Sequence, residues 1–188
     1  MYKRVISEED YQKFHQIKKA VWEENGFEME SAKAGSTCFL MIAEEGEAVG
    51  TVEFTPFAKV SDSMKNLFQD VLEEDMVAME LDSFAVLPNY RKKLGGEIVC
   101  LMVDFAEKHG FTHAIAIFQP AYLNSLQNRY GLEGKQVKEQ FYYKGDNVAP
   151  GILNLKEMYT NKQDGRFSWY SEPVEQKEEV LAWGTSTY

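Results

Sequence analysis

Long apolar runs and cysteines are scarce in this chain of 188 residues. No apolar run approaches the roughly 20 residues that a membrane-spanning helix needs, which argues against a membrane protein. The two cysteines, Cys38 and Cys100, lie inside apolar runs, so we expect buried thiols in a reducing compartment. The first residues carry no signal-peptide pattern, and the sequence therefore predicts a cytoplasmic protein.

Positive charge is also in deficit. The chain has 20 Lys and Arg residues against 30 Asp and Glu residues, which gives a formal net charge of −10. A nucleic-acid partner requires a basic face, so this balance argues against one. It suits a cationic or amine-bearing substrate instead.

Several catalytic signatures are missing. The sequence has no Gly-x-Ser-x-Gly, no Gly-x-x-x-x-Gly-Lys-Ser/Thr and no paired Cys-x-x-Cys motif. His109 and His113 are four residues apart, but Gly110 is expected to end the helix that would align them on a metal. Cys100 lacks surroundings that stabilise a thiolate nucleophile. We therefore predict neither a metal site nor an acyl-enzyme.

The length and the 44% hydrophobic share allow one domain with a sizeable core. Helical and alternating apolar periods predict an α/β (α+β) fold, and strands on either side of the long helix must be joined by a crossover. Part of the sheet is thus expected to be parallel. The expected helices are 8–24, 61–74, 97–109 and 121–130, and the expected strands are 2–6, 38–43, 49–54, 77–86, 112–118, 137–143 and 152–155.

These elements occupy residues 1–158, which we interpret as one domain. Residues 159–188 contain more Lys, Gln, Glu and Ser but keep aromatic and apolar residues. Aromatic side chains in an ordered segment usually pack on something, so we predict an extension that packs on its own domain or on the partner subunit of a homodimer. The residues concerned are Phe167, Trp169, Tyr170, Val180, Leu181 and Trp183.

The stretch from Glu80 to Gly96 carries the most informative pattern. A predicted strand ends at Pro88, because proline lacks a donor for the sheet. A basic turn at 91–96 follows and opens the long helix. Amide N–H groups at such a turn point outward and the helix dipole favours negative charge, so the segment is suited to a pyrophosphate group.

This stretch resembles motif A of the GNAT superfamily of N-acyltransferases. In that motif a strand and a proline precede Arg/Gln-x-x-Gly-x-Gly/Ala. Phe84–Val86, Pro88, Arg91 and Gly96 fall in register with the motif, whereas Leu94 stands in place of its first glycine. The resemblance extends over the predicted domain. It implies a GNAT-like mixed central sheet of about six to seven strands flanked by helices, with acetyl-CoA as co-substrate.

The resemblance also implies how the donor is bound. Amides and cationic side chains of the basic turn would hold the pyrophosphate. The backbone of the strand end would pair with pantetheine and place one amide near the thioester oxygen. The plainer interpretation is a solvated helix start and an ordinary core strand. The implied cofactor-binding residues are Phe84, Ala85, Val86, Arg91, Lys92, Lys93, Leu94, Gly95 and Gly96.

Acyl transfer to an amine needs a base, because an alkyl ammonium titrates at about 10.4 and arrives protonated. Glu80 and Asp82 share a strand face with Phe84. Glu80 also lies five residues before Ala85, where some GNAT members place their base. We interpret Glu80 as the candidate base, the alternative being a carboxylate at the solvated end of the strand.

The general acid is less clear. Many GNAT proteins carry a Tyr on the helix after the fifth strand that protonates the leaving thiolate, but Gln127 stands at that position here. Tyr130 is our candidate, and Tyr122 lies on the same helix. Aromatic packing at a helix end is the alternative for each, and water could also supply the proton.

The predicted function is N-acetyl transfer from acetyl-CoA to a primary amine of a small molecule or peptide, in a ternary complex. Two alternatives stay open. One is transfer of a longer acyl chain, as in the N-acyl amino acid and acyl-homoserine-lactone synthases that share the GNAT core. The other is a non-catalytic module that binds coenzyme A.

Overall fold

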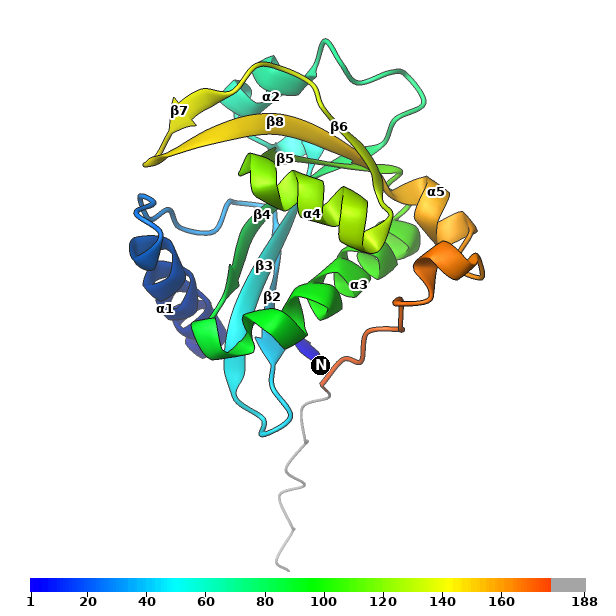
Figure 1. Cartoon of the computed structure of the whole chain (residues 1–188). Coiled ribbons are helices and arrows are strands. Elements are labelled where there is room, and N and C mark those ends of the chain that lie inside the picture. The colour runs from blue at the N-terminus through cyan, green and yellow to red at the C-terminus, as the bar shows by residue number, and fades with distance from the viewer. Residues whose placement is uncertain (177–188) are drawn as a thin grey trace, which may run out of the picture.

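The computed structural model describes residues 1–176. It contains one mixed sheet of eight strands in the order β1-β2-β3-β4-β5-β8-β6, with β7 paired to β8 (Figure 1). The strands are β1 (Tyr2–Arg4), β2 (Thr37–Ile42), β3 (Ala48–Pro56), β4 (Ala78–Val86), β5 (His113–Phe118), β6 (Glu133–Gln136), β7 (Phe141–Tyr143) and β8 (Asp146–Asn154). The α-helices are α1 (Glu8–Glu24), α2 (Asp62–Phe68), α3 (Arg91–His109), α4 (Pro120–Tyr130) and α5 (Leu155–Thr160).

The predicted fold class is confirmed. The sheet is mixed because β4 and β5, which flank α3, run parallel, while their neighbours pair antiparallel. An eighth strand appears because the segment predicted as one strand, 137–143, contributes only to β7, and β6 precedes it.

Two predicted helix bounds were wrong. The helix predicted over 61–74 ends at Phe68, since the acidic run Glu73–Asp75 would meet the negative end of the helix dipole. The basic segment 91–96 belongs to α3 itself. A 3₁₀ turn at Pro88–Tyr90 leads directly into α3, because proline's fixed φ suits the first residue of a helix.

The helices cover both faces of the sheet (Figure 1). Apolar side chains of α3 and α4, such as Leu101 and Leu126, form the main core with one face. On the other face α1 packs on β2, and α2 packs on β5 and β8 through Phe68. Successive residues of β5 alternate between these cores: Ala116 belongs to the main core and Ile115 to the core under α2.

The described part of the C-terminal extension packs on the same chain. Phe167 is buried in the main core, and Trp169 Nε1 donates a hydrogen bond to the Tyr130 carbonyl at 3.0 Å. Further along, Tyr2 N–H donates to Val174 O, and Gln176 N–H donates to Tyr2 O. The division at residue 158 stays a prediction, and Val180, Leu181 and Trp183 lie outside the described residues.

Both cysteines are buried free thiols. Within residues 1–176, none of the helices has the length and apolar character required to cross a membrane.

Candidate active site

A bulge interrupts β4 in the centre of the sheet. Thr51 of β3 pairs with Ala85, but Glu53 pairs with Asp82, so β4 carries one extra residue between these pairs. Ser83 sits there with a φ of 55°, a left-handed conformation that is uncommon outside glycine. Thr51 Oγ1 donates to Ser83 O at 2.7 Å, and Ser83 Oγ donates to Glu53 Oε2 at 2.7 Å. These buried hydrogen bonds hold the bulge in place.

Beside the bulge, β4 separates from β5. The two strands pair from Ala78 with His113 to Glu80 with Ile115, and the described residues show no pairing beyond that point. The carboxyl-terminal half of β4 is therefore bonded to β3 but not to β5. A gap in the sheet results.

A cavity of about 980 Å³ occupies this region. Its walls include Phe84 and Phe118, which pack with the α3 and α4 side, and also Met64 and Ile117, which pack with the α2 side. Because the lining comes from both faces, the cavity reaches through the sheet at the gap between β4 and β5.

A buried ionic group lies on the α1 side of the cavity. Lys33, from the loop between α1 and β2, places Nζ 2.6 Å from Glu80 Oε1 and 2.6 Å from Asp82 Oδ2. The backbone N–H of Lys33 also donates to Glu53 Oε1 at 2.7 Å. Glu80 is only 4% exposed, and its Oε2 is buried with no hydrogen-bond partner in the described chain. The Oε2 atom is therefore the free basic position of the group.

The surroundings separate the acidities of these groups. Burial raises the pKa of Glu80 to about 7; the Lys33 ammonium opposes this effect and the Asp82 charge adds to it. Burial also disfavours ionisation of Asp82, but Lys33 and Lys18 outweigh it and hold the pKa of Asp82 below its ordinary value. Although burial alone would lower the pKa of Lys33, the two carboxylates raise it above its ordinary value. Of these groups, Glu80 is the one suited to exchange a proton near neutral pH.

The first turn of α3 lies at one end of the cavity. The N-cap residue of this helix, Tyr90, makes no side-chain hydrogen bond among the described residues, whereas the Arg91 N–H donates to Pro88 O of the preceding 3₁₀ turn. Arg91 lines the cavity, and its Nε donates to Val86 O at 3.1 Å while Nη2 pairs with Glu24 Oε2 at 2.5 Å. An uncapped N-terminus beside an arginine is suited to an anion.

Two tyrosines of α4 lie differently with respect to the cavity. Tyr122 lines it, with its ring 4.9 Å from that of Phe84, and its hydroxyl is buried without a partner in residues 1–176. Burial raises the pKa of Tyr122 well above its ordinary value of 10.0. Tyr130 is not among the lining residues; its ring packs edge-on against Trp169 with centroids 4.9 Å apart.

A family model described as the acetyltransferase (GNAT) family matches residues 5–127. This is more than half of the chain. The chain belongs to the GNAT family. It is therefore an acyltransferase, as the resemblance of residues 84–96 implied. A search of curated protein sequences finds no match.

Several solved structures share the fold of this chain. FeeM, an N-acyl amino acid synthase from uncultured soil microbes, has a TM-score of 0.70 at 12% identity, covering 85% of this chain and 93% of FeeM. BjaI, a CoA-dependent acyl-homoserine lactone synthase, has a TM-score of 0.72 at 13% identity, covering 96% of this chain and 95% of BjaI. A putative N-acetyltransferase from Lactobacillus plantarum has a TM-score of 0.61 at 13% identity, covering 82% and 97%.

The structure brings part of the predicted GNAT site together. Four of the predicted residues line the same cavity, namely Glu80, Phe84, Val86 and Arg91. Gly95 and Gly96 instead lie inside α3, where a Cβ atom at either position would be 3.6–3.8 Å from the Tyr130 hydroxyl. The predicted roles of the remaining cofactor residues stay predictions. Of these, Ala85 is buried in β4, Leu94 faces the main core, and Lys92 and Lys93 are exposed on α3.

Sequence reasoning missed three residues of the site. Lys33 lies in a polar loop with no periodic pattern, and it meets Glu80 across 47 positions of sequence. Glu53 sits in a strand that is buried on both faces. Such a strand has no alternation of buried and exposed positions that would have indicated which way Glu53 points. Ser83 carries a left-handed φ that no local residue pattern signals.

Proposed function

We propose that this GNAT protein transfers the acyl group of an acyl-coenzyme A to a primary amine, and that its preferred acyl chain is longer than acetyl. The observation that carries the proposal is the cavity of about 980 Å³ that reaches through the sheet beside the free edge of β4. Such a passage allows donor and acceptor to approach from opposite faces and to meet in a ternary complex.

The residues at the donor side fit a coenzyme A thioester. The uncapped start of α3 and Arg91 supply N–H donors and positive charge for a diphosphate. The edge of β4 from Phe84 to Val86 does not pair with β5 and offers backbone groups to the amides of a pantetheine arm, although Val86 O already accepts a hydrogen bond from Arg91 Nε at 3.1 Å. When bound, the thioester supplies an activated carbonyl carbon for attack by the amine.

At the acceptor side, Glu80 Oε2 would take a proton from the incoming ammonium. The resulting amine attacks the thioester carbonyl, a C–N bond forms, and the C–S bond breaks to release the coenzyme A thiolate. Glu80 then releases its proton to solvent. A backbone N–H at the β4 bulge would stabilise the tetrahedral oxyanion. The nitrogen loses its second proton as the amide forms. The thiolate receives a proton from a buried hydroxyl, for which Tyr122 in the cavity lining is the candidate, or from water, and the proton released by the nitrogen restores that donor.

The lining of the cavity favours a donor longer than acetyl. Apolar side chains contribute to it from β4, β5, β8 and α2, among them Phe84, Phe118, Val148 and Met64. An acetyl group has a single methyl to bury, whereas each further methylene placed against such walls contributes up to about 0.8 kcal/mol. FeeM and BjaI, which share this fold, are named for N-acyl amino acid and acyl-homoserine lactone synthesis, and this also supports the proposal. Acetyl-CoA stays a prediction and forms the short end of the series to be tested.

A donor series tests the proposal. Acetyl-, butanoyl-, hexanoyl- and octanoyl-CoA are each incubated with the protein and a panel of primary amines, and thiol release is followed. We expect kcat/KM to rise from acetyl- to hexanoyl-CoA by at least about tenfold, equivalent to 1.4 kcal/mol. An acetyl optimum would overturn the chain-length claim. Donors that raise the melting temperature but release no thiol with any amine would support the non-catalytic binding module instead.

A further inference from the structure

The cavity already contains one primary ammonium, that of Lys33. Its Nζ lies 2.6 Å from Glu80 Oε1 and 2.6 Å from Asp82 Oδ2, and all three residues line the cavity. Although burial favours the neutral amine, Asp82 and Glu80 raise the pKa of Lys33 above its ordinary value, so the group is an ammonium. Glu80 and Asp82, the acid pair, therefore form a site for a primary alkylammonium, and the chain fills this site with its own side chain.

Lys33 leaves part of the acid pair unused. Glu80 is 4% exposed, and its Oε2 has no hydrogen-bond partner in residues 1–176. A buried carboxyl oxygen without a donor is costly, so it favours a ligand that brings an N–H group to it. An ammonium on a separate molecule is not tied to the backbone of this chain, and it can turn a further N–H toward Oε2.

The backbone around Lys33 is held in place, whereas the tip of its side chain is held only by the acid pair. Ala32 N–H donates to His15 Nε2 at 3.0 Å, Lys33 N–H donates to Glu53 Oε1 at 2.7 Å, and Ser36 Oγ donates to Lys33 O at 2.7 Å. The Lys33 side chain is 24% exposed, so a path to solvent exists. Rotation of this side chain would vacate the site while the loop keeps its backbone hydrogen bonds.

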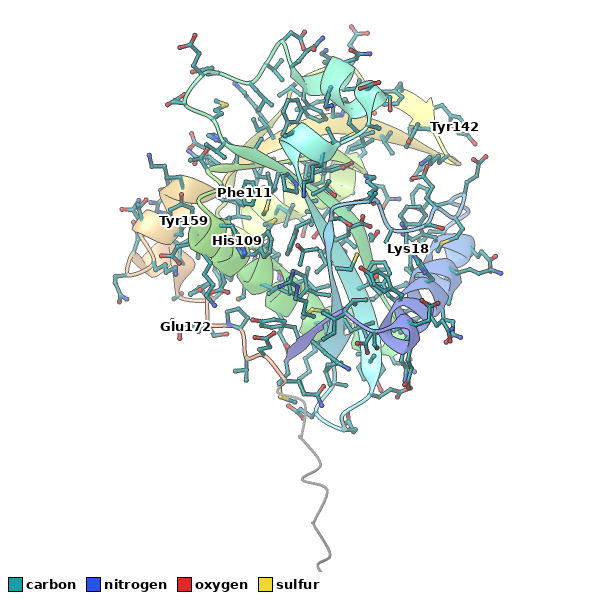
Figure 2. The ribbon with its side chains drawn as sticks, turned by 180° about the vertical axis from the view of Figure 1, so that it is seen from behind. Lys18, His109, Phe111, Tyr142, Tyr159 and Glu172 are labelled. Carbon is teal, nitrogen blue, oxygen red and sulfur yellow. The ribbon has the colours of Figure 1, made fainter. Side chains whose placement is uncertain are left out.

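Two other lysines of this region do not bond to the acid pair. Lys18 lies on α1 and faces the sheet (Figure 2), where its Nζ is 4.2 Å from the centroid of the Trp22 ring and has no hydrogen-bond partner in residues 1–176. Lys59 lines the cavity, but among the described residues the acid pair forms its ion pairs with Lys33 alone. Lys33 is thus the cation that an incoming ammonium has to replace.

We propose that the acid pair is the ammonium subsite of the acceptor and that Lys33 occupies this subsite until an acceptor displaces it. The inference rests on the proposed function. Two ammonium groups at one acid pair repel each other, so the acceptor binds by exchange and Lys33 lowers the affinity for it. The occupant is an ammonium on a flexible four-carbon stem, and the ligand class that fits the subsite is a primary amine on an unbranched aliphatic chain.

The test empties the subsite with Lys33→Ala in the full-length protein. The probe is n-butylammonium, which has the carbons and the charge of the lysine stem, and 1-butanol is the uncharged control. Lys59→Ala is the matched control variant, because it removes the same charge from the cavity lining and leaves the acid pair with Lys33. Binding is measured by calorimetry without acyl-CoA at about pH 8.5, where Glu80 is ionised and the alkylamine is protonated. The KM for n-butylamine is then measured with hexanoyl-CoA.

In Lys33→Ala, the dissociation constant and the KM of n-butylamine should both fall by at least about tenfold, equivalent to 1.4 kcal/mol. In Lys59→Ala, both should stay within about threefold of wild type, and 1-butanol should bind to neither variant. An unchanged or higher dissociation constant in folded Lys33→Ala overturns the inference, as does an equal gain in Lys59→Ala. A lysine that only stabilises the loop would produce no gain in affinity.

If Lys33→Ala does not fold, a wild-type crystal soaked with n-butylammonium decides. The ligand should bond to the acid pair with Lys33 Nζ displaced, and intact ion pairs between Lys33 and the acids overturn the inference. Acyl transfer by a Lys33→Ala protein that shows no gain in affinity overturns the inference and leaves the proposed function intact. Tight binding of n-butylammonium without thiol release from any acyl-CoA supports the ammonium site and refutes the proposed function.

Discussion

Replacement of Glu80 by glutamine tests the proposed proton transfer. The amide keeps the size of the side chain and can still accept a hydrogen bond from Lys33, but it cannot take a proton. With the pKa of Glu80 raised to about 7, wild-type kcat/KM should rise about tenfold per pH unit below pH 7 and level off above it. General bases contribute typically about 10²–10⁴-fold, so Glu80→Gln should lose at least about 100-fold at pH 7.5, or about 2.7 kcal/mol of barrier.

The assay is thiol release from a saturating acyl-CoA with varied amine, measured from pH 5.5 to 9. Glu80→Gln should remove the limb near pH 7 and leave a profile governed by the titration of the free amine. Glu139→Gln is the control, because Glu139 is exposed and lies outside the cavity lining. If Glu80→Gln stays within about threefold of wild type at neutral pH, a barrier change under about 1 kcal/mol, then Glu80 is not the base.

Three further predictions concern stability and donor binding. The folded state keeps Glu80 protonated up to about pH 7, whereas the unfolded chain releases this proton at about 4.3. The free energy of unfolding should therefore fall as pH rises between these values, by up to about 3 kcal/mol more in wild type than in Glu80→Gln. Urea titrations at pH 4.5 and 7.5 measure this free energy, and an equal decrease in both proteins would contradict the prediction. Ser83→Ala removes the hydroxyl bonded to Glu53 and should cost about 1.5–3 kcal/mol of unfolding free energy, whereas Ser83→Gly should recover about 1 kcal/mol because glycine accepts the positive φ; chemical denaturation with Gly no more stable than Ala would contradict the strain argument. Arg91→Ala should raise the dissociation constant of coenzyme A by about tenfold, measured by calorimetry, with no such change in Lys19→Ala.

The sequence predicted those helix ends that depend only on residues a few positions away. The bounds of α1 were predicted from a polar start and an apolar stripe, and the structure shows a capping box in which Ser7 Oγ accepts from Asp10 N–H. Gly110 and Gly131 end α3 and α4 in the left-handed conformation that favours glycine. In each case neighbours within a few positions determine the outcome.

The chemistry of the site depends on contacts that no local pattern contains. The sequence placed Glu80 on the correct strand, but its partner Lys33 comes from a distant loop, and the bulge at Ser83 depends on pairing with β3. The pKa of Glu80 follows from that burial and those charges, so it could not be predicted from the sequence. The resemblance to motif A identified the family, although residues 91–96 turned out to be helical from Arg91 onward.

A crystal structure of the protein with hexanoyl-CoA tests the central claim most directly. We predict the diphosphate at the first amides of α3 beside Arg91, the pantetheine arm along the free edge of β4, and the thioester carbon within reach of an amine bound at Glu80 Oε2. Density for the cofactor outside the gap between β4 and β5, or a thioester on the far side of the sheet from Glu80, would contradict the account.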